Sequence, residues 1–207
     1  PLASENARAS SYLKNRKLDP DKFYYAERFK HFCNTIKPTF TNVRDEHARI
    51  VIPMYDSNKR LIGLQGRALD GFVQPKYLTL MLVEDHPKVY GFDTIDETKQ
   101  VYVTEGPFDS TFIDNSIAMC GSDVDLSGYG DLEFTYVFDN EPRNREIVSK
   151  ITKSIEKSHK VVIFPTQIRE KDINDMVLAG HDVNSLLESN TYTGLKAKLK
   201  LQTWKKV

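Results

Sequence analysis

One stretch of the sequence places a carboxylate between a strand and a helix. Residues 101–104 (Val-Tyr-Val-Thr) are typical of a short strand, and Glu105 follows them directly. Gly106 then turns the chain, and Pro107 suits the first position of a helix because its missing N–H would have no partner there. In open α/β sheets, ligands bind at the carboxyl ends of the strands. The sequence therefore predicts that Glu105 lies at a ligand-binding edge.

Two later stretches follow the same pattern. Residues 134–138 and 161–164 are apolar, and acidic residues follow each of them, after a loop in the second case. If the three strands lie parallel in one sheet, these acids converge, and carboxylates that close repel one another unless a cation lies among them. A single such acid is more commonly a helix cap, but three in register favour a binding site. The predicted cation ligands are Glu105, Asp139, Glu141, Asp172 and Asp175.

The chemistry of these ligands selects the cation. All of them are carboxylates, with no histidine or cysteine among them, and this set favours Mg²⁺ or Mn²⁺ over zinc. The two cysteines, Cys33 and Cys120, are far apart in the sequence, which indicates neither a disulfide framework nor a zinc site. We expect them to be buried free thiols in a reducing compartment.

Charge and length limit the class of protein. The 207 residues include 29 basic and 29 acidic side chains, so the formal net charge is zero. Any contact with nucleic acid must then come from local basic patches. The length allows one large domain or two small ones. No apolar run approaches the length of a membrane span and no signal peptide is visible, so we expect a cytoplasmic protein, and the first residue, Pro1, suggests a fragment.

The N-terminal part is predicted to be helical. Residues 3–18 form one expected helix, and Asp19-Pro20 is a start signal for a second helix that runs to about Ile36. The second helix carries aromatic residues that could stack on nucleobases, although such a stripe at helical spacing more often belongs to the core. These aromatic residues are Phe23, Tyr24, Phe29 and Phe32.

A β region with embedded basic residues follows. Short strands are expected at 48–56, 61–67, 75–79 and 88–92, the first two as a hairpin. Arg67 and Lys76 each interrupt an otherwise apolar pattern, which is costly unless the charge faces a groove or an anion. Gly66 has no side chain and would let another backbone approach closely.

The second half alternates between strands and helices, as in a βαβ arrangement. Strands are predicted at 101–104, 116–120, 133–138 and 160–164, and helices at 107–114, 142–158, 172–179 and 183–188, with a polar loop at 122–131. The last residues, 193–207, hold five lysines and no acid. This segment either contacts a nucleic-acid backbone or an acidic partner, or is a solvated tail.

Together these motifs resemble a Toprim domain. Residues 105–106 (Glu-Gly) match the family's glutamate turn, and residues 139–141 (Asp-Asn-Glu) match its paired acids, although a glutamate stands where the family has a second aspartate. Residues 171–175 (Lys-Asp-Ile-Asn-Asp) are similar to the third acidic stretch of phage primases.

The first half separates primases from other Toprim proteins. Its motifs resemble, in order, those of the small domain that precedes Toprim in bacterial-type primases, and most of the chain is similar to the helicase-associated primases of T-even-like phages. The motifs are Arg49-x-x-x-Pro53, Gly66-Arg67, Pro75-Lys76-Tyr77 and Tyr90-Gly91. Family members also carry an N-terminal zinc-binding module, so we expect a fragment that holds the RNA-polymerase part and no zinc.

The resemblance implies an α/β fold, α+β overall. A small N-terminal subdomain of helices and basic strands would cover residues 1–98. A Toprim domain with a central, mainly parallel sheet flanked by helices would cover residues 99–190, and a basic tail residues 191–207.

The resemblance also implies a DNA primase catalytic core that makes short RNA primers on single-stranded DNA by two-metal nucleotidyl transfer during phage replication. Two Mg²⁺ or Mn²⁺ ions would lie among Glu105, Asp139 and Glu141, with Asp172 and Asp175 as further ligands, and Glu105 is alternatively a general base. The implied partners are the template, ribonucleoside triphosphates and a replicative hexameric helicase, in the host bacterial cytoplasm. The predicted nucleotide or template contacts are Arg49, Arg67, Lys76 and Lys171.

Two other functions stay open at this point. A metal-dependent Toprim nuclease or a topoisomerase-like enzyme would cut strands. Cleavage by tyrosine needs a nucleophile on another module, and none of the ten tyrosines stands out, whereas cleavage by metal ions alone stays open. A non-catalytic partner of a helicase that only binds single-stranded DNA would be expected to lose the paired acids, which this sequence keeps.

Overall fold

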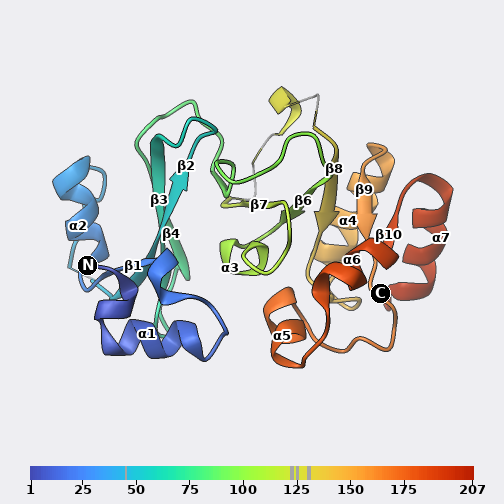
Figure 1. Ribbon diagram of the computed structural model, residues 1–207, viewed down its shortest axis with the longest axis horizontal. Coiled ribbons are helices and arrows are strands. Elements are labelled where there is room, and N and C mark those ends of the chain that lie inside the picture. The colour runs from blue at the N-terminus through green and yellow to red at the C-terminus, as the bar shows by residue number, and fades with distance from the viewer. Residues whose placement is uncertain (45, 122–123, 125, 130–131) are drawn as a thin grey trace. The chain divides into compact units, whose positions relative to one another are not determined.

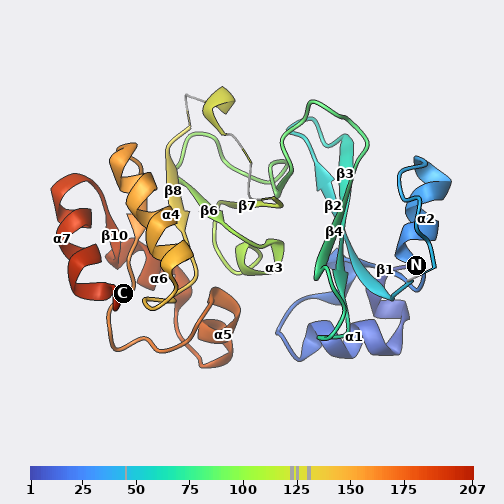
Figure 2. The same ribbon diagram turned by 180° about the vertical axis from the view of Figure 1, so that it is seen from behind.

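The computed structural model describes residues 1–207 except 45, 122–123, 125, 130 and 131. The chain divides into two units, Pro1–Asp93 and Thr94–Val207, whose elements are shown in Figures 1 and 2. The polar loop expected at 122–131 lies partly outside the described residues, and its described part contains the 3-10 turn η3 (Ser127–Tyr129). No helix in the described part of the chain is long and apolar enough to cross a lipid bilayer.

The first unit is less helical than the sequence suggests. Its helical elements are η1 (Ala3–Glu5), α1 (Ala7–Lys14), η2 (Pro20–Lys22) and α2 (Phe29–Ile36). The prediction of one helix from Asp19 to Ile36 is therefore wrong over its first half. Asp19 does cap a turn, because its Oδ1 accepts a hydrogen bond from the N–H of Asp21 at 3.0 Å. Residues 24–26 then form a strand, since pairing with a neighbouring strand outweighs their place in a helical pattern.

An antiparallel sheet forms the centre of the first unit, with the strand order β1-β2-β3-β4. The strands are β1 (Tyr24–Ala26), β2 (Arg49–Tyr55), β3 (Leu61–Ala68) and β4 (Tyr77–Met81), and the short β5 (Val89–Tyr90) follows them in the chain. The predicted hairpin is confirmed as β2–β3. Asp56 forms its turn, because Asp56 Oδ1 accepts hydrogen bonds from the N–H groups of Asn58 at 2.9 Å and Arg60 at 3.0 Å.

The ring of Phe29 packs α2 against this sheet. A Cβ atom at Gly66 would lie 2.6 Å from that ring, so the glycine makes room for a side chain and not for a second backbone. Phe23 and Phe29 are fully buried, whereas Tyr24 is 42% exposed and Phe32 39% exposed. The aromatic stripe therefore belongs to the core only in part.

A mainly parallel sheet forms the centre of the second unit. Within this unit the strand order is β10-β9-β8-β6-β7. The strands β7, β6, β8 and β9 are parallel, and β10 pairs with β9 in the antiparallel sense. The strands are β6 (Val101–Thr104), β7 (Ser116–Met119), β8 (Phe134–Val137), β9 (Lys160–Val162) and β10 (Thr191–Tyr192). This arrangement agrees with the predicted α/β fold.

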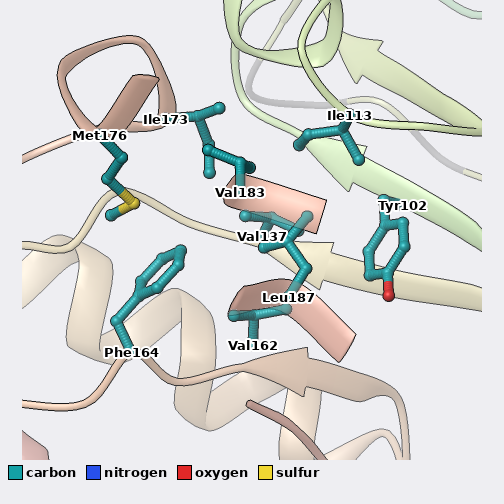
Figure 3. Close-up of a cluster of buried hydrophobic side chains, with 9 residues drawn as sticks. All are labelled: Tyr102, Ile113, Val137, Val162, Phe164, Ile173, Met176, Val183 and Leu187. Atoms are coloured by element: carbon teal, nitrogen blue, oxygen red, sulfur yellow. The ribbon is translucent and has the colours of Figure 1, made fainter. Parts of the chain in front are cut away.

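Helices cover both faces of the second sheet. They are α3 (Pro107–Ser110), α4 (Arg145–Glu156), α5 (Ile173–Leu178), α6 (Val183–Ser189) and α7 (Gly194–Trp204). Successive side chains of a strand point to opposite faces. Val162 accordingly joins the buried cluster with α5 and α6 that is shown in Figure 3, and Val161 joins the cluster with α4 and α7. Burial on both faces explains why these strands are nearly continuous apolar runs.

The C-terminal segment is a packed helix, where the sequence suggested a basic tail. Residues 191–207 contribute β10 and α7 to the second unit. Ala197, Leu201 and Trp204 are buried in the cluster with α4, and Lys198 lies on the exposed side. Their spacing of four and three residues is the helical signal in this segment, which the run of lysines obscured.

Candidate active site

Three neighbouring strands deliver acidic residues to one edge of the second sheet. Strands β6 and β8 are parallel, with Thr104 opposite Val137, and β8 and β9 are parallel as well. Glu105 follows β6 directly, and Asp139 follows β8 after one further residue. The loop after β9 leads to Asp172, which caps α5. Parallel strands that end together thus place these side chains at their common carboxyl edge.

Asp139 lies among charges of its own sign. Burial raises the pKa of Asp139 to about 6, and the charges of Glu105, Asp172 and Glu141 add to the rise, whereas the charge of Lys171 opposes it. Interactions of this size require short distances. The structure therefore brings together four of the five predicted acids. We call Glu105, Asp139, Glu141 and Asp172 the acid edge.

Two lysines supply positive charge at the acid edge. Lys171 Nζ lies 4.0 Å from Asp139 Oδ2 and 3.6 Å from Glu141 Oε1. Lys150 Nζ, from α4, lies 2.5 Å from Glu105 Oε1. Burial lowers the pKa of Lys150, but its hydrogen bonds to Glu105 and Glu146 outweigh this effect, so that its pKa is raised. Both lysine side chains therefore face carboxylates of the acid edge.

Lys150 is a site residue that the sequence analysis missed. It lies in the middle of an amphipathic helix, where a lysine is usually part of the solvated face. Its only local signal is Glu146, four residues earlier, whose Oε1 lies 3.0 Å from Lys150 Nζ. The pairing with Glu105 depends on how α4 packs beside β6, which the local sequence does not encode.

Glu141 is held by the start of α4. That helix begins after Asn144, and not at Pro142 as predicted, because Asn144 Oδ1 accepts hydrogen bonds from the N–H groups of Glu146 and Ile147. The Asn144 N–H donates to the Glu141 carbonyl at 2.9 Å, and Asn144 Nδ2 donates to Glu141 Oε2 at 3.3 Å. The capping residue therefore also orients the second acid of the pair.

The third acidic stretch combines capping with its place at the acid edge. Asp172 Oδ1 accepts a hydrogen bond from the N–H of Asp175 at 2.8 Å, the usual bond of an N-cap. Asp175 itself is exposed, and its predicted role as a ligand stays a prediction. The buried Asn174 donates its N–H to Asp109 Oδ1 at 3.1 Å, which ties α5 to α3.

The acid edge fits a divalent cation in its chemistry. Within the described residues, no group of three or more histidine, cysteine, aspartate or glutamate side chains is arranged so that it could hold a metal ion. The ligand atoms available are nevertheless carboxylate oxygens, which Mg²⁺ prefers. Burial first, and then the charges of the neighbouring carboxylates, raise the pKa of Asp139, and a bound cation would oppose both effects. The residues that would hold an ion are Glu105, Asp139, Glu141 and Asp172.

In the first unit, two predicted basic residues gather around one aromatic ring. Arg67 and Tyr77 are opposite each other in the β3–β4 pair, and Arg67 donates to the Tyr77 hydroxyl at 2.5 Å. The Arg67 guanidinium lies 4.9 Å from the centre of the Tyr77 ring, and Lys76 Nζ lies 6.0 Å from it. Arg67 is 9% exposed, while Lys76 is exposed. Tyr77 thus organises both cations, a role that the sequence analysis did not assign to it.

Arg49 has a different environment from the other predicted basic contacts. It is 2% exposed, and burial lowers the pKa of its guanidinium, an effect that the charge of Glu46 opposes. Arg49 donates to the carbonyl oxygens of Gly66 (2.9 Å), Pro75 (2.9 Å) and Lys76 (3.1 Å). These bonds hold the backbone just before Arg67 and just before Tyr77. A direct contact of Arg49 with nucleotide or template stays a prediction.

Comparison with known proteins gives one similar curated protein. No protein-family model matches the sequence. The DNA primase of Enterobacteria phage T4 is 31% identical over 206 residues, which cover 95% of this chain and 60% of the phage protein. The chain thus spans about 60% of the length of that relative. The resemblance to the primases of T-even-like phages is confirmed.

Solved structures show the same fold. A DNA primase domain from Pseudomonas aeruginosa matches 92% of this chain and 74% of its own, with a TM-score of 0.68 at 20% identity. A DnaG primase catalytic domain bound to single-stranded DNA matches 84% of this chain and 68% of its own, with a TM-score of 0.60 at 16% identity. The predicted fold class is confirmed. None of these matches favours the strand-cleaving or the non-catalytic alternative.

Proposed function

We propose that this chain is the catalytic core of a DNA primase, which joins ribonucleotides into short primers on a single-stranded DNA template. The observation that carries the proposal is the crowding of Glu105, Glu141 and Asp172 around Asp139 in a chain that is 31% identical to a phage primase. A nucleotidyl transfer needs a place where negative oxygens of a triphosphate can be held beside a 3′-hydroxyl, and an acidic edge that binds cations meets this need.

The carboxylates of the acid edge would hold Mg²⁺ or Mn²⁺, as a pair of ions. When bound, such ions supply a lowered pKa for the attacking 3′-hydroxyl and neutralise the charge of the pyrophosphate leaving group. Asp139, Glu141 and Glu105 would be the main ligands, with Asp172 and Asp175 as further ligands. Glu105 is alternatively the general base, the role that the family resemblance implied.

The cationic side chains have separate tasks. Lys150 orients Glu105 through their 2.5 Å contact. Lys171 approaches both Asp139 and Glu141 and is 55% exposed, so it can exchange these carboxylates for the oxygens of an incoming triphosphate. Arg67 and Lys76 would hold template or triphosphate oxygens, Arg67 with its planar fork and Lys76 as a point charge. A replicative hexameric helicase would be the further partner, as the resemblance to helicase-associated primases implied.

The test is a primer-synthesis assay with the chain as given. The protein is incubated with single-stranded DNA, four ribonucleotides and Mg²⁺ or Mn²⁺, and the products are separated on a denaturing gel. New short RNA is the expected result. Asp139→Ala should abolish it, and Glu156→Ala, which removes an exposed acid at the end of α4, should not. Shortened template would point to a nuclease, and DNA binding without either product would point to a non-catalytic partner.

A further inference from the structure

The buried side chain of Asn140, between the two acids of the pair, connects three segments of the second unit. Asn140 is 8% exposed. Its Nδ2 donates to the carbonyl oxygens of Ile168 at 3.1 Å and Glu170 at 3.0 Å. Its Oδ1 accepts a hydrogen bond from Trp204 Nε1 at 3.0 Å. Its backbone N–H donates to the Lys171 carbonyl at 2.6 Å.

These contacts use both N–H groups and the oxygen of the Asn140 amide, and they fix its orientation. The indole N–H of Trp204 is a donor only, so it must face the amide oxygen, and the two N–H bonds of the amide then face the two carbonyls. Aspartate would present an oxygen to both carbonyls, and an aliphatic side chain would leave all these groups unpaired. Buried polar groups that lose their partners are costly, so the arrangement specifies asparagine.

The segment that Asn140 holds leads directly into the acid edge. Residues 168–171 are the last part of the loop that follows β9, and they end at Lys171, whose Nζ lies 3.6 Å from Glu141 Oε1. Asp172 comes next in the chain. On the other side, Trp204 is buried on α7, and the next turn of the chain makes a second tie, because the Lys206 N–H donates to the Pro142 carbonyl at 2.8 Å. The C-terminal segment therefore contacts the loop of the acid pair at two points, through Trp204 of α7 and through Lys206 just after it.

We propose that Asn140 is a positioning residue, which sets the place of Lys171 and Asp172 relative to Asp139 and Glu141 and makes that placement depend on the docking of α7 through Trp204. The inference rests on the proposed function for its link to catalysis. The mechanical link itself can be tested without catalysis, because Trp204 is the single tryptophan of the sequence and reports directly on the contact.

The first experiment follows Trp204 emission during a Mg²⁺ titration. In the wild-type chain, Mg²⁺ at the acid edge should change the emission of Trp204. In Asn140→Ala, checked for folding by circular dichroism, this response should be lost. Asn184→Ala is the matched control, since it removes a half-buried amide whose oxygen accepts a hydrogen bond from the Asp114 N–H at 2.9 Å, near the start of β7 and away from the carboxyl edge of the sheet, and it should keep the response. A wild-type response that persists unchanged in Asn140→Ala would overturn the proposal.

The second experiment covers the case in which Asn140→Ala does not fold. Trp204→Phe keeps an aromatic ring in the buried cluster but lacks the N–H donor. It should raise the Mg²⁺ concentration for half-maximal primer synthesis about 3- to 10-fold, the equivalent of one lost buried hydrogen bond, and leave the maximal rate at saturating Mg²⁺ much less affected. An unchanged Mg²⁺ requirement would mean that Trp204 serves packing alone, against the proposal.

The two proposals can fail separately. A chain that shows the Asn140-dependent emission response but makes no primers would reject the proposed function and keep the positioning role. A chain that makes primers with the same Mg²⁺ dependence in the wild type, Asn140→Ala and Trp204→Phe would keep the function and reject the positioning role.

Discussion

Lys150 Nζ and Glu105 Oε1 lie 2.5 Å apart, and this contact joins the middle of α4 to the end of β6. Both side chains are partly buried, with 33% of Lys150 and 25% of Glu105 exposed. A charged hydrogen bond in such surroundings is stronger than one on the open surface. Lys150 therefore holds Glu105 in place from α4, a helix outside the three strands that lead to the acids.

Lys150→Met should lower primer synthesis about 10- to 100-fold, because a lost charged hydrogen bond of about 1.5–3 kcal/mol frees Glu105 from its catalytic orientation. Lys150→Arg should recover part of the activity, since it keeps the charge. The steady-state rate at saturating Mg²⁺ is the measurement. Lys153→Met is the control, as it removes an exposed lysine from the same helix. Equal losses of primer synthesis in both variants would show that the net charge of α4, and not the contact with Glu105, causes the effect.

The raised pKa of Asp139 predicts a pH-dependent stability. Its pKa is about 6 in the folded state, against the ordinary 3.8, and burial is the main cause. The folded state thus binds the Asp139 proton more tightly than the unfolded state does. Protonation of Asp139 therefore stabilises the folded state fully below about pH 4, and this stabilisation is lost as the pH rises through 6. Asp139→Asn should exceed the wild type in unfolding free energy by about 1–3 kcal/mol at pH 8 and match it near pH 4. Urea unfolding at both pH values measures this, and a difference that does not change with pH would contradict it.

The same titration predicts how the wild type responds to divalent ions. Ion binding requires the ionised carboxylate, so primer synthesis should fall as the pH drops through about 6, and ion binding near that pH should release a proton from Asp139. Saturating Mg²⁺ at pH 8 should raise the melting temperature of the wild type, because a cation relieves the repulsion around Asp139. Asp139→Asn should show little of this increase, and an equal increase in both proteins would place the ion elsewhere.

Arg49→Lys tests whether this buried arginine positions other residues or contacts the ligand itself. Lysine cannot serve the carbonyls of Gly66, Pro75 and Lys76 with the geometry of a guanidinium fork. We expect a loss of about 1–3 kcal/mol in unfolding free energy and a higher KM for template or nucleotide, with a smaller change in kcat.

The salt dependence of template binding separates the two roles of Arg49. A residue that contacts a phosphate contributes about one unit to the slope of log affinity against log salt concentration, and a positioning residue contributes none of its own. We expect Arg49→Lys and Arg49→Ala to keep the wild-type slope, and Arg67→Ala to flatten it. Arg44→Ala, at an exposed position of the same unit, is the control for a change of net charge. A flatter slope in Arg49→Ala would show that Arg49 contacts a phosphate directly, against the positioning role.

The acid edge was predictable because it depends on regular elements. A short apolar strand followed by Glu105, and a second followed by Asp139, place their acids at one edge once the strands are parallel. Burial on both faces makes such strands nearly continuous apolar runs, which are recognisable in the sequence. Lys150 and Asn140 were not predictable. Each acts through a partner 45 or 64 positions away, on an element whose packing no local pattern specifies.

The errors in the fold have a similar cause. Tyr24–Ala26 has helical neighbours and an aromatic spacing that suits a helix, yet it forms β1 because β2 offers it a partner. The helix α7 was hidden by lysines that cover one side of it, while Ala197, Leu201 and Trp204 fill the other. In both segments the local sequence is compatible with two conformations, and contacts with the rest of the unit select one of them.

Gly66→Ala should destabilise the first unit through the ring of Phe29. The added Cβ would lie 2.6 Å from that ring, and Phe29 is fully buried between α2 and β3, so it has little room to move. Overpacking of this kind costs about 1–3 kcal/mol. Gly71→Ala is the matched control, since nothing lies within 4 Å of the corresponding position, and it should leave the unfolding free energy unchanged or slightly increased. Equal stabilities of the two variants in urea unfolding would show that the Phe29 ring can move aside, and that Gly66 is not required for the packing of α2.

Because β3 also carries Arg67, a shift of the strand should weaken template binding in Gly66→Ala and not in Gly71→Ala.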